Sequence, residues 1–254
     1  MPLTSPNGTP ITVRPIEPEH LDRIVLRCWP DRDTLARLFA EQGTIGMAAW
    51  EGDKSVGLLH CYRVTLPDWT TDHWPQWSRW CPDPTWWSEA ARSANLALTG
   101  PAWCHACCHV GRTLESSQEE ALPSGWDKGI CKGIDTRYLG RGIGTALCKA
   151  SIQWARQHDY AAVVAPAPPN GLFKLLIWSG GLPWTSYAKL GFDIIGYRTE
   201  VGWTTEPGDE LPRWAQGDSP PEVMAEARAA LAAGRPAREF RARLMALDLT
   251  KTLH

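Results

Sequence analysis

Alternating glycines before a helical pattern are the residues of this sequence best suited to bind an anion. The stretch reads Tyr138-Leu139-Gly140-Arg141-Gly142-Ile143-Gly144-Thr145. Because glycine has no Cβ, backbone N–H groups can approach a ligand closely there. Apolar residues follow at helical spacing from Leu147 to Ala155, and a helix N-terminus adds unpaired N–H groups and the positive end of the helix dipole. The stretch therefore predicts a phosphate or pyrophosphate site at the start of a helix.

Two nucleotide-binding patterns fit this stretch poorly, because no Gly-Lys-Ser/Thr follows as in a P-loop and the third Rossmann glycine is missing. The stretch instead resembles the acyl-CoA loop of the GCN5-related N-acetyltransferases, whose pattern is Arg/Gln-x-x-Gly-x-Gly/Ala. Gly142 and Gly144 match its last two fixed positions. Leu139 stands where the family has Arg or Gln, and Arg141 is placed to replace part of the lost positive charge.

A second segment resembles the same family in its late Tyr-x-x-x-Gly-Phe pattern. It reads Ser186-Tyr187-Ala188-Lys189-Leu190-Gly191-Phe192. In the family this tyrosine ends a helix and faces the thioester sulfur, so the resemblance implies that Tyr187 protonates the leaving thiolate. Residues 11–16 look like the first strand of the family, and the resemblance therefore extends over about residues 11–200.

The resemblance implies an α/β (α+β) fold with a central, mixed, twisted sheet flanked by helices. It also implies an enzyme that moves an acetyl group from acetyl-CoA to a primary amine by direct attack, without a covalent intermediate. The residues expected to bind the cosubstrate are Ile134, Asp135, Leu139, Gly140, Arg141, Gly142, Ile143, Gly144 and Thr145. A strand over Gly129–Asp135 is expected to offer backbone N–H groups to the thioester and the pantetheine arm.

The general base has several candidates. His109 and His105 have suitable intrinsic pKa values. A carboxylate acting through water, such as Asp135, is an alternative. A core histidine without a chemical role is a further interpretation of either imidazole.

A cluster of cysteine and histidine residues raises the question of a metal site. It reads Cys104-His105-Ala106-Cys107-Cys108-His109, and the spacing of Cys104 and Cys107 suits zinc. A strand directs successive side chains to opposite faces, however, and a second ligand pair is missing. We therefore expect small buried thiols on a core strand and no metal.

Composition restricts the remaining function classes. The chain has 254 residues, of which 43% are hydrophobic, and a formal net charge of −2, so its charge gives no sign of a nucleic-acid partner. It has no 18-residue apolar run, so no membrane partner is expected. Eight cysteines without an export signal indicate reduced thiols and a cytoplasmic protein.

The sequence predicts an acetyltransferase-like domain over residues 1–205, with an insertion at about 66–100 and a loop at about 112–127. Six of the 15 tryptophans lie between Asp68 and Glu89. We expect most of them to pack within the insertion, and one or two to reach the substrate pocket. Residues 206–254 are predicted to form a linker and a helical hairpin that packs on the domain, with a homodimer contact as the alternative.

Three functions remain open from the sequence. The favoured one is an N-acetyltransferase whose acceptor is a small-molecule amine, because the aromatic insertion would enclose a pocket. The alternative is a non-catalytic acyl-CoA-binding module that contacts a protein partner, supported by the missing Arg or Gln at Leu139. The third is a zinc-dependent structural or nucleic-acid module centred on the cysteines and histidines.

Overall fold

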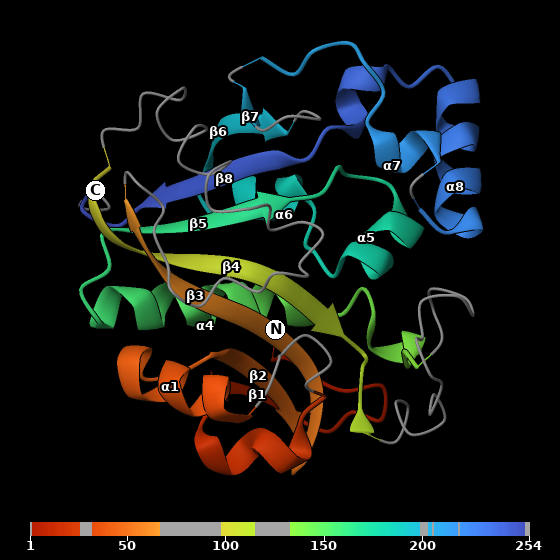
Figure 1. Cartoon of the computed structure of the whole chain (residues 1–254). Helices are drawn as coiled ribbons and strands as arrows, with labels where there is room; N and C mark the ends of the chain where they lie inside the picture. Colours follow the sequence, from red (N-terminus) through yellow and green to blue (C-terminus); the bar gives the residue numbers. More distant parts are fainter. Residues whose placement is uncertain are drawn as a thin grey trace.

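The computed structural model describes residues 2–25, 32–66, 98–114, 133–198, 203–204, 206–217 and 219–251. These residues form one eight-stranded mixed sheet in the order β1-β2-β3-β4-β5-β8-β6-β7 (Figure 1). The strands are β1 Ile11–Pro15, β2 Gly46–Glu51, β3 Lys54–Leu66, β4 Gly100–Val110, β5 Ala162–Ala167, β6 Asp193–Arg198, β7 Trp203–Thr204 and β8 Arg243–Asp248. β4 and β5 run parallel, and the other neighbouring strands are antiparallel.

Helices lie on both faces of this sheet. The α-helices are α1 Arg32–Gln42, α4 Ile143–Gln157, α5 Phe173–Ser179, α6 Trp184–Ala188, α7 Arg213–Gln216 and α8 Pro221–Ala232. The 3-10 helices are η1 Pro18–Arg23, η2 Thr136–Tyr138 and η3 Ala237–Phe240. The mixed sheet flanked by helices, as expected from the sequence, is confirmed.

Strand β2 shows how the two faces are divided. Met47 and Ala49 pack with α4, whereas Ala48 and Trp50 pack on the opposite face with the α1 side chains. This alternation is the period-two pattern of a strand that is covered on both sides. α4 thus seals one face of the sheet and fixes the position of the glycine stretch at its N-terminus (Figure 1).

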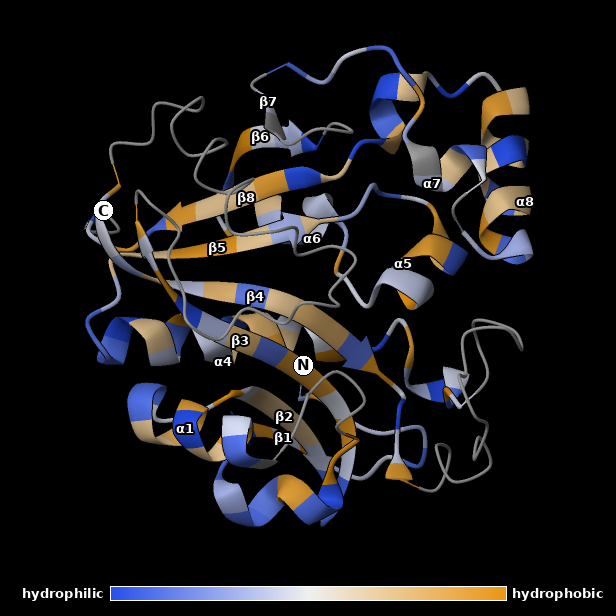
Figure 2. Ribbon diagram, in the orientation of Figure 1, coloured by the Kyte–Doolittle hydropathy of each residue, from blue (hydrophilic) through white to orange (hydrophobic). Residues whose placement is uncertain are grey.

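The predicted C-terminal helical hairpin is wrong in its second half. Helix α8 forms within the predicted hairpin, but residues 243–248 form strand β8 between β5 and β6. Leu244 packs on one face of the sheet and Met245 on the other, and both are fully buried. Figure 2 shows hydrophobic residues along both β5 and β8. A domain boundary at residue 205 is therefore also wrong, because β8 completes the sheet.

A buried strand explains this error. Leu244 and Leu247 are spaced as on one face of a helix, yet a short apolar run covered on both sides gives the same pattern as a strand. The pairing partner, which the local sequence does not contain, decides between the two structures.

The strand predicted over Gly129–Asp135 is a second correction. Residues 129–132 lie outside the described residues, and 133–135 form a turn and an irregular segment. Among the described residues, the last strand before the glycine stretch is β4, which ends at Val110.

Parts of the other predicted segments cannot be compared with the structure. Residues 67–97 of the Trp-rich insertion and 115–127 of the predicted loop lie outside the described residues. Within the part that is described, no helix combines the length and the apolar character needed to cross a membrane.

Candidate functional site

The parallel strands β4 and β5 separate part of the way along their length. They pair only where Ala102–Cys104 lies opposite residues 162–164. Beyond this point β4 continues along β3, while β5 continues along β8 (Figure 1). The backbone edge of β4 beyond Cys104 is therefore not paired with β5 and has to find other hydrogen-bond partners.

The segment Ser179–Leu182, which begins at the last residue of α5, occupies this separation. The backbone N–H of Cys108 on β4 donates to the carbonyl oxygen of Gly180. Gly180 has a φ of +64°, and a Cβ there would overlap the ring of His109. Leu182 reaches the start of α4, where a Cβ added to Gly144 would lie 2.6 Å from its Cδ2 atom. One segment thus contacts both the separated edge of β4 and the first turn of α4.

The glycine stretch forms an exposed turn that opens directly into α4. Gly140 and Gly142 have φ values of +72° and +82°, a left-handed conformation that favours glycine. A Cβ at either position would meet no atom within 4 Å, so the space in front of the turn is open. The N-cap residue of α4 is Gly142, which provides no side-chain hydrogen bond to the first backbone N–H groups of the helix. A turn of left-handed glycines therefore lies at the predicted helix N-terminus, and its binding of an anion stays a prediction.

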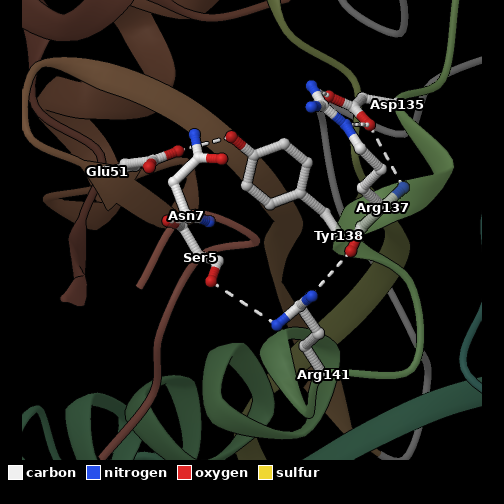
Figure 3. A network of polar contacts seen from close by, with 7 residues as sticks. All are labelled: Ser5, Asn7, Glu51, Asp135, Arg137, Tyr138 and Arg141. Carbon is white, nitrogen blue, oxygen red and sulfur yellow. Dashed lines mark hydrogen bonds and ion pairs between the residues drawn. The ribbon is translucent and has the colours of Figure 1, made fainter. Parts of the chain in front are cut away.

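The basic side chains near this turn are held by other groups. Arg141 donates from Nε to the carbonyl oxygen of Arg137 at 2.7 Å, and from NH1 to that of Ser5 at 3.4 Å (Figure 3). Arg137 forms an ion pair of 2.6 Å with Asp135. Arg141 therefore binds backbone oxygens and does not fully replace a cation facing the turn.

The other predicted cosubstrate residues divide into two groups. Ile143, Gly144 and Thr145 begin α4 and carry its first N–H groups. Ile134, Asp135 and Leu139 lie before the turn and are partly buried. Side-chain hydrogen bonds from Arg137 lower the pKa of Asp135, which makes this carboxylate a weak base.

His105 lies in the core between the sheet and α4, which corrects its interpretation as a base in a cleft. It is 1% exposed, and its Nε2 is 3.0 Å from Ser151 Oγ. Its Nδ1 is 3.7 Å from Cys148 Sγ. Burial lowers the pKa of His105 to about 3, because a charged imidazole would lose its hydration there. His105 therefore stays neutral and is a poor proton acceptor.

Tyr187 also lies in the core and not on an open cleft. It is 3% exposed on α6, and its ring packs on Phe192 with the centroids 5.1 Å apart. Its hydroxyl group makes a hydrogen bond with Cys148, and burial raises the pKa of the phenol well above its usual value. The backbone N–H of Phe192 donates to the Tyr187 carbonyl at 3.2 Å, so the Tyr-x-x-x-Gly-Phe pattern here closes a compact turn.

His109 is the predicted catalytic side chain that stays partly exposed. It lies on β4 beside Gly180, and its ring is 6.1 Å from the ring of His60 in an edge-to-face arrangement. Of His105, Tyr187 and His109, His109 alone is partly exposed and lies against Gly180 at the separated part of β4.

The cysteines behave as core thiols in the part of the chain that the structure describes. Cys61, Cys104, Cys108 and Cys148 are buried, and no group of three or more His, Cys, Asp or Glu residues is arranged to hold a metal ion there. Burial raises the pKa of Cys61, Cys108 and Cys148, so these thiols stay protonated and unreactive.

Sequence reasoning missed the residues that are hydrogen-bonded to the segment around the glycine turn. Tyr138, just before the turn, donates a hydrogen bond to Glu51 at the end of β2 (Figure 3). Ser5, in the N-terminal segment, accepts from Arg141 through its carbonyl oxygen. No local pattern joins these residues, because Ser5, Glu51 and Tyr138 lie far apart in the sequence and meet only in the folded chain.

No protein-family model matches the chain, and no curated protein sequence matches it. Solved structures with similar architecture include a mosquito arylalkylamine N-acetyltransferase like 5b, which is 12% identical with a TM-score of 0.47 over 94% of this chain and 99% of that one. The ribosomal-protein-S18-alanine N-acetyltransferase from Escherichia coli is 12% identical, with a TM-score of 0.42 over 96% of this chain and 97% of that one. An agmatine N-acetyltransferase is 10% identical, with a TM-score of 0.45 over 94% and 99%.

Proposed function

We propose that the protein is an N-acyltransferase that transfers an acetyl group from acetyl-CoA to the primary amine of a small molecule. The observation that carries this proposal is the placement of the exposed, uncapped glycine turn beside the separated edge of β4. Ser179–Leu182 contacts both features, so a single extended ligand could span them. An anionic group suits the turn, and an arm with hydrogen-bonding amides suits a strand edge that β5 does not pair with.

Each part of the site has a role in this reaction. Acetyl-CoA, when bound, supplies the thioester whose acetyl group is transferred. The N–H groups of Gly144 and Thr145 at the start of α4 would bind its pyrophosphate. The Cys108 N–H would stabilise the negative charge that develops on the carbonyl oxygen, because a donor held on a strand needs little reorganisation as the charge forms. Gly180 holds that N–H in this structure and would have to release it.

His109 is the proposed proton acceptor for the attacking amine. It lies on the same strand as the Cys108 N–H, one residue further along, and it is partly exposed. Tyr187 and His105 would support the packing of α4 and α6, and the thiolate would take its proton from solvent. The tight surroundings of His109, between Gly180 and His60, favour a small acceptor.

The strand positions at which the Trp-rich insertion begins and ends lie away from His109. It joins the end of β3 to the start of β4, where Leu66 pairs with Gly100. His109 pairs with Leu58 towards the other end of the same ladder. Eight residues of strand separate these two pairs, which corresponds to about 27 Å. The proposal of a small acceptor is therefore supported by the surroundings of His109 and not by the insertion.

Acetyl-CoA consumption with a panel of amines tests this function. The panel should contain diamines, arylalkylamines, amino acids and a peptide with a free N-terminus. We expect turnover with at least one small amine and loss of turnover in His109→Gln, which keeps a polar side chain but removes the imidazole. Turnover with the peptide but with none of the small amines would contradict the small-molecule acceptor. Full activity of His109→Gln would contradict the assignment of His109 as the base.

The burial of His105 and Tyr187 also favours a second candidate, a non-catalytic acyl-CoA-binding module. Such a module keeps the glycine turn but needs no acid or base. Calorimetry with CoA separates the two functions. The module predicts CoA binding without acetyl transfer to any amine of the panel, whereas the enzyme predicts both.

A further inference from the structure

The glycine turn, residues 139–142, is hydrogen-bonded to a compact turn near the N-terminal end of the chain. Thr4 and Pro10 form an isolated antiparallel bridge, and we refer to residues 4–10 as the N-terminal turn. Within it, Ser5 Oγ accepts from the backbone N–H groups of Asn7 and Thr9, each at 3.2 Å. Ser5 is 1% exposed, so the turn is folded against the protein.

Glu51 joins this N-terminal turn to the glycine turn. Hydrogen bonds from Ser5 and Tyr138 lower the pKa of Glu51, so the group is a charged acceptor shared by the two segments. Tyr138 is 3% exposed, and burial raises the pKa of its phenol, which keeps the proton on the donor. A hydrogen bond to a charged group is worth about twice a neutral one.

Arg141 forms a second connection between the same two segments. It lies between Gly140 and Gly142 and donates to the carbonyl oxygens of Arg137 and Ser5 (Figure 3). The turn is thus held on the inner side through Tyr138 and at its tip through Arg141. Because its two glycines have no side chains to pack, the turn has few other means of keeping one conformation.

We propose that Tyr138, Glu51 and the N-terminal turn are positioning residues that hold the glycine turn in its ligand-binding conformation. This inference rests on the proposed function, because the ligand is the pyrophosphate of CoA. None of the three touches the reacting atoms. Their effect is on binding, through the direction of the N–H groups that an anion requires.

Hydrogen–deuterium exchange without ligand, followed by calorimetry with CoA, tests this role. Tyr138→Phe removes the hydroxyl group and keeps the ring, and Glu51→Gln keeps the shape and removes the charge. We expect faster exchange of the amides of residues 139–142 in both variants and a Kd for CoA raised about tenfold. In turnover, KM for acetyl-CoA should rise with kcat nearly unchanged.

A matched control separates positioning from general loss of stability. Tyr160→Phe removes a hydroxyl group from another buried tyrosine, which packs on Trp103 and on Trp154 in the last turn of α4. It is expected to leave both the exchange of the glycine turn and the Kd for CoA at their wild-type values. The double variant Tyr138→Phe with Glu51→Gln should weaken CoA binding by less than the sum of the two single effects, because both substitutions act on the same Tyr138–Glu51 hydrogen bond.

The outcomes distinguish this inference from the proposed function. Unchanged exchange in Tyr138→Phe, or faster exchange with an unchanged Kd, would overturn the positioning role. If the wild-type protein binds no CoA, the proposed function fails. Faster exchange in the variants would then still support the connection between the two turns.

Discussion

His105 shows how burial changes the use of a residue with suitable chemistry. Its imidazole is enclosed by Ser151 and Cys148, and Ser151 also accepts from Trp103 Nε1 at 2.9 Å. These partners satisfy a neutral ring and offer no carboxylate to a charged one. The side chain therefore contributes to packing specificity between β4 and α4 and not to proton transfer.

The low pKa of His105 predicts a pH dependence of stability. The unfolded chain binds a proton near the usual value of 6.5 and the folded protein only near 3, so stability is complete above 6.5 and is lost as the pH falls below it. From about pH 6.5 to about pH 5 the loss should be about 2 kcal/mol. We therefore expect the free energy of unfolding, measured with urea at several pH values, to depend less steeply on pH in His105→Asn than in the wild type. An equal pH dependence in both proteins would mean that His105 can be protonated in the folded state.

Tyr187→Phe tests whether the phenol takes part in catalysis. Its hydroxyl group contacts Cys148 inside the core, so we expect a stability loss of about 1 kcal/mol and an almost unchanged single-turnover rate. Rapid-quench measurement of acetyl transfer decides this point. A rate reduced by about 100-fold would restore the general acid implied by the family resemblance.

At the scale of the elements, Ser179–Leu182 is the segment on which the site depends most. It satisfies the edge of β4 through the Gly180 carbonyl and touches α4 through Leu182. A ligand that lies along β4 has to displace it. Glycines at 180 and 181 make this displacement easier, because glycine adopts many backbone conformations.

Gly180→Ala should displace this segment without any ligand. Gly180 and Gly234 have similar left-handed φ values of +64° and +85°, but a Cβ at Gly234 would meet no atom within 4 Å. Gly234→Ala should therefore lose only about 1 kcal/mol of stability, through backbone strain. Gly180→Ala should lose more stability, because its Cβ also overlaps the ring of His109. Hydrogen exchange of the Cys108 amide should be faster only in Gly180→Ala. Equal exchange in both variants would show that the segment does not protect this edge.

The sequence predicted elements whose local pattern is complete. The start of α4 follows from alternating glycines and an apolar stripe, and β4 follows from a run of small buried residues. Strand β8 could not be predicted in this way, because its identity depends on pairing with β5 and β6. The positions of His105 and Tyr187 also depend on tertiary packing, which the short motifs around them do not encode.

At the scale of the whole molecule, the C-terminal segment is part of the sheet. β8 lies between β5 and β6, so the sheet has no continuous hydrogen bonding without it. Leu244 and Met245 are both 0% exposed, and their loss would open both faces of the core. An unpaired edge at β5 would also favour aggregation.

Truncation tests this architecture. A chain ending at residue 205 is expected to aggregate or to lack a cooperative thermal transition, whereas a chain ending at Thr250, which retains β8, should unfold much as the full chain does. Circular dichroism during heating and size-exclusion chromatography measure the two properties. A folded, cooperative chain of residues 1–205 would contradict the position of β8 in the sheet.

Calorimetric titration with CoA of the wild type, Gly142→Val and Gly234→Val tests the central claim most directly. Both glycines have left-handed φ values, +82° and +85°, and open space around the added side chain, so the two substitutions should cost similar stability. Only Gly142 precedes α4, where a side chain would crowd the first N–H groups. We predict that the Kd for CoA rises about tenfold or more in Gly142→Val and stays at the wild-type value in Gly234→Val. A folded Gly142→Val variant that binds CoA as tightly as the wild type would contradict the account.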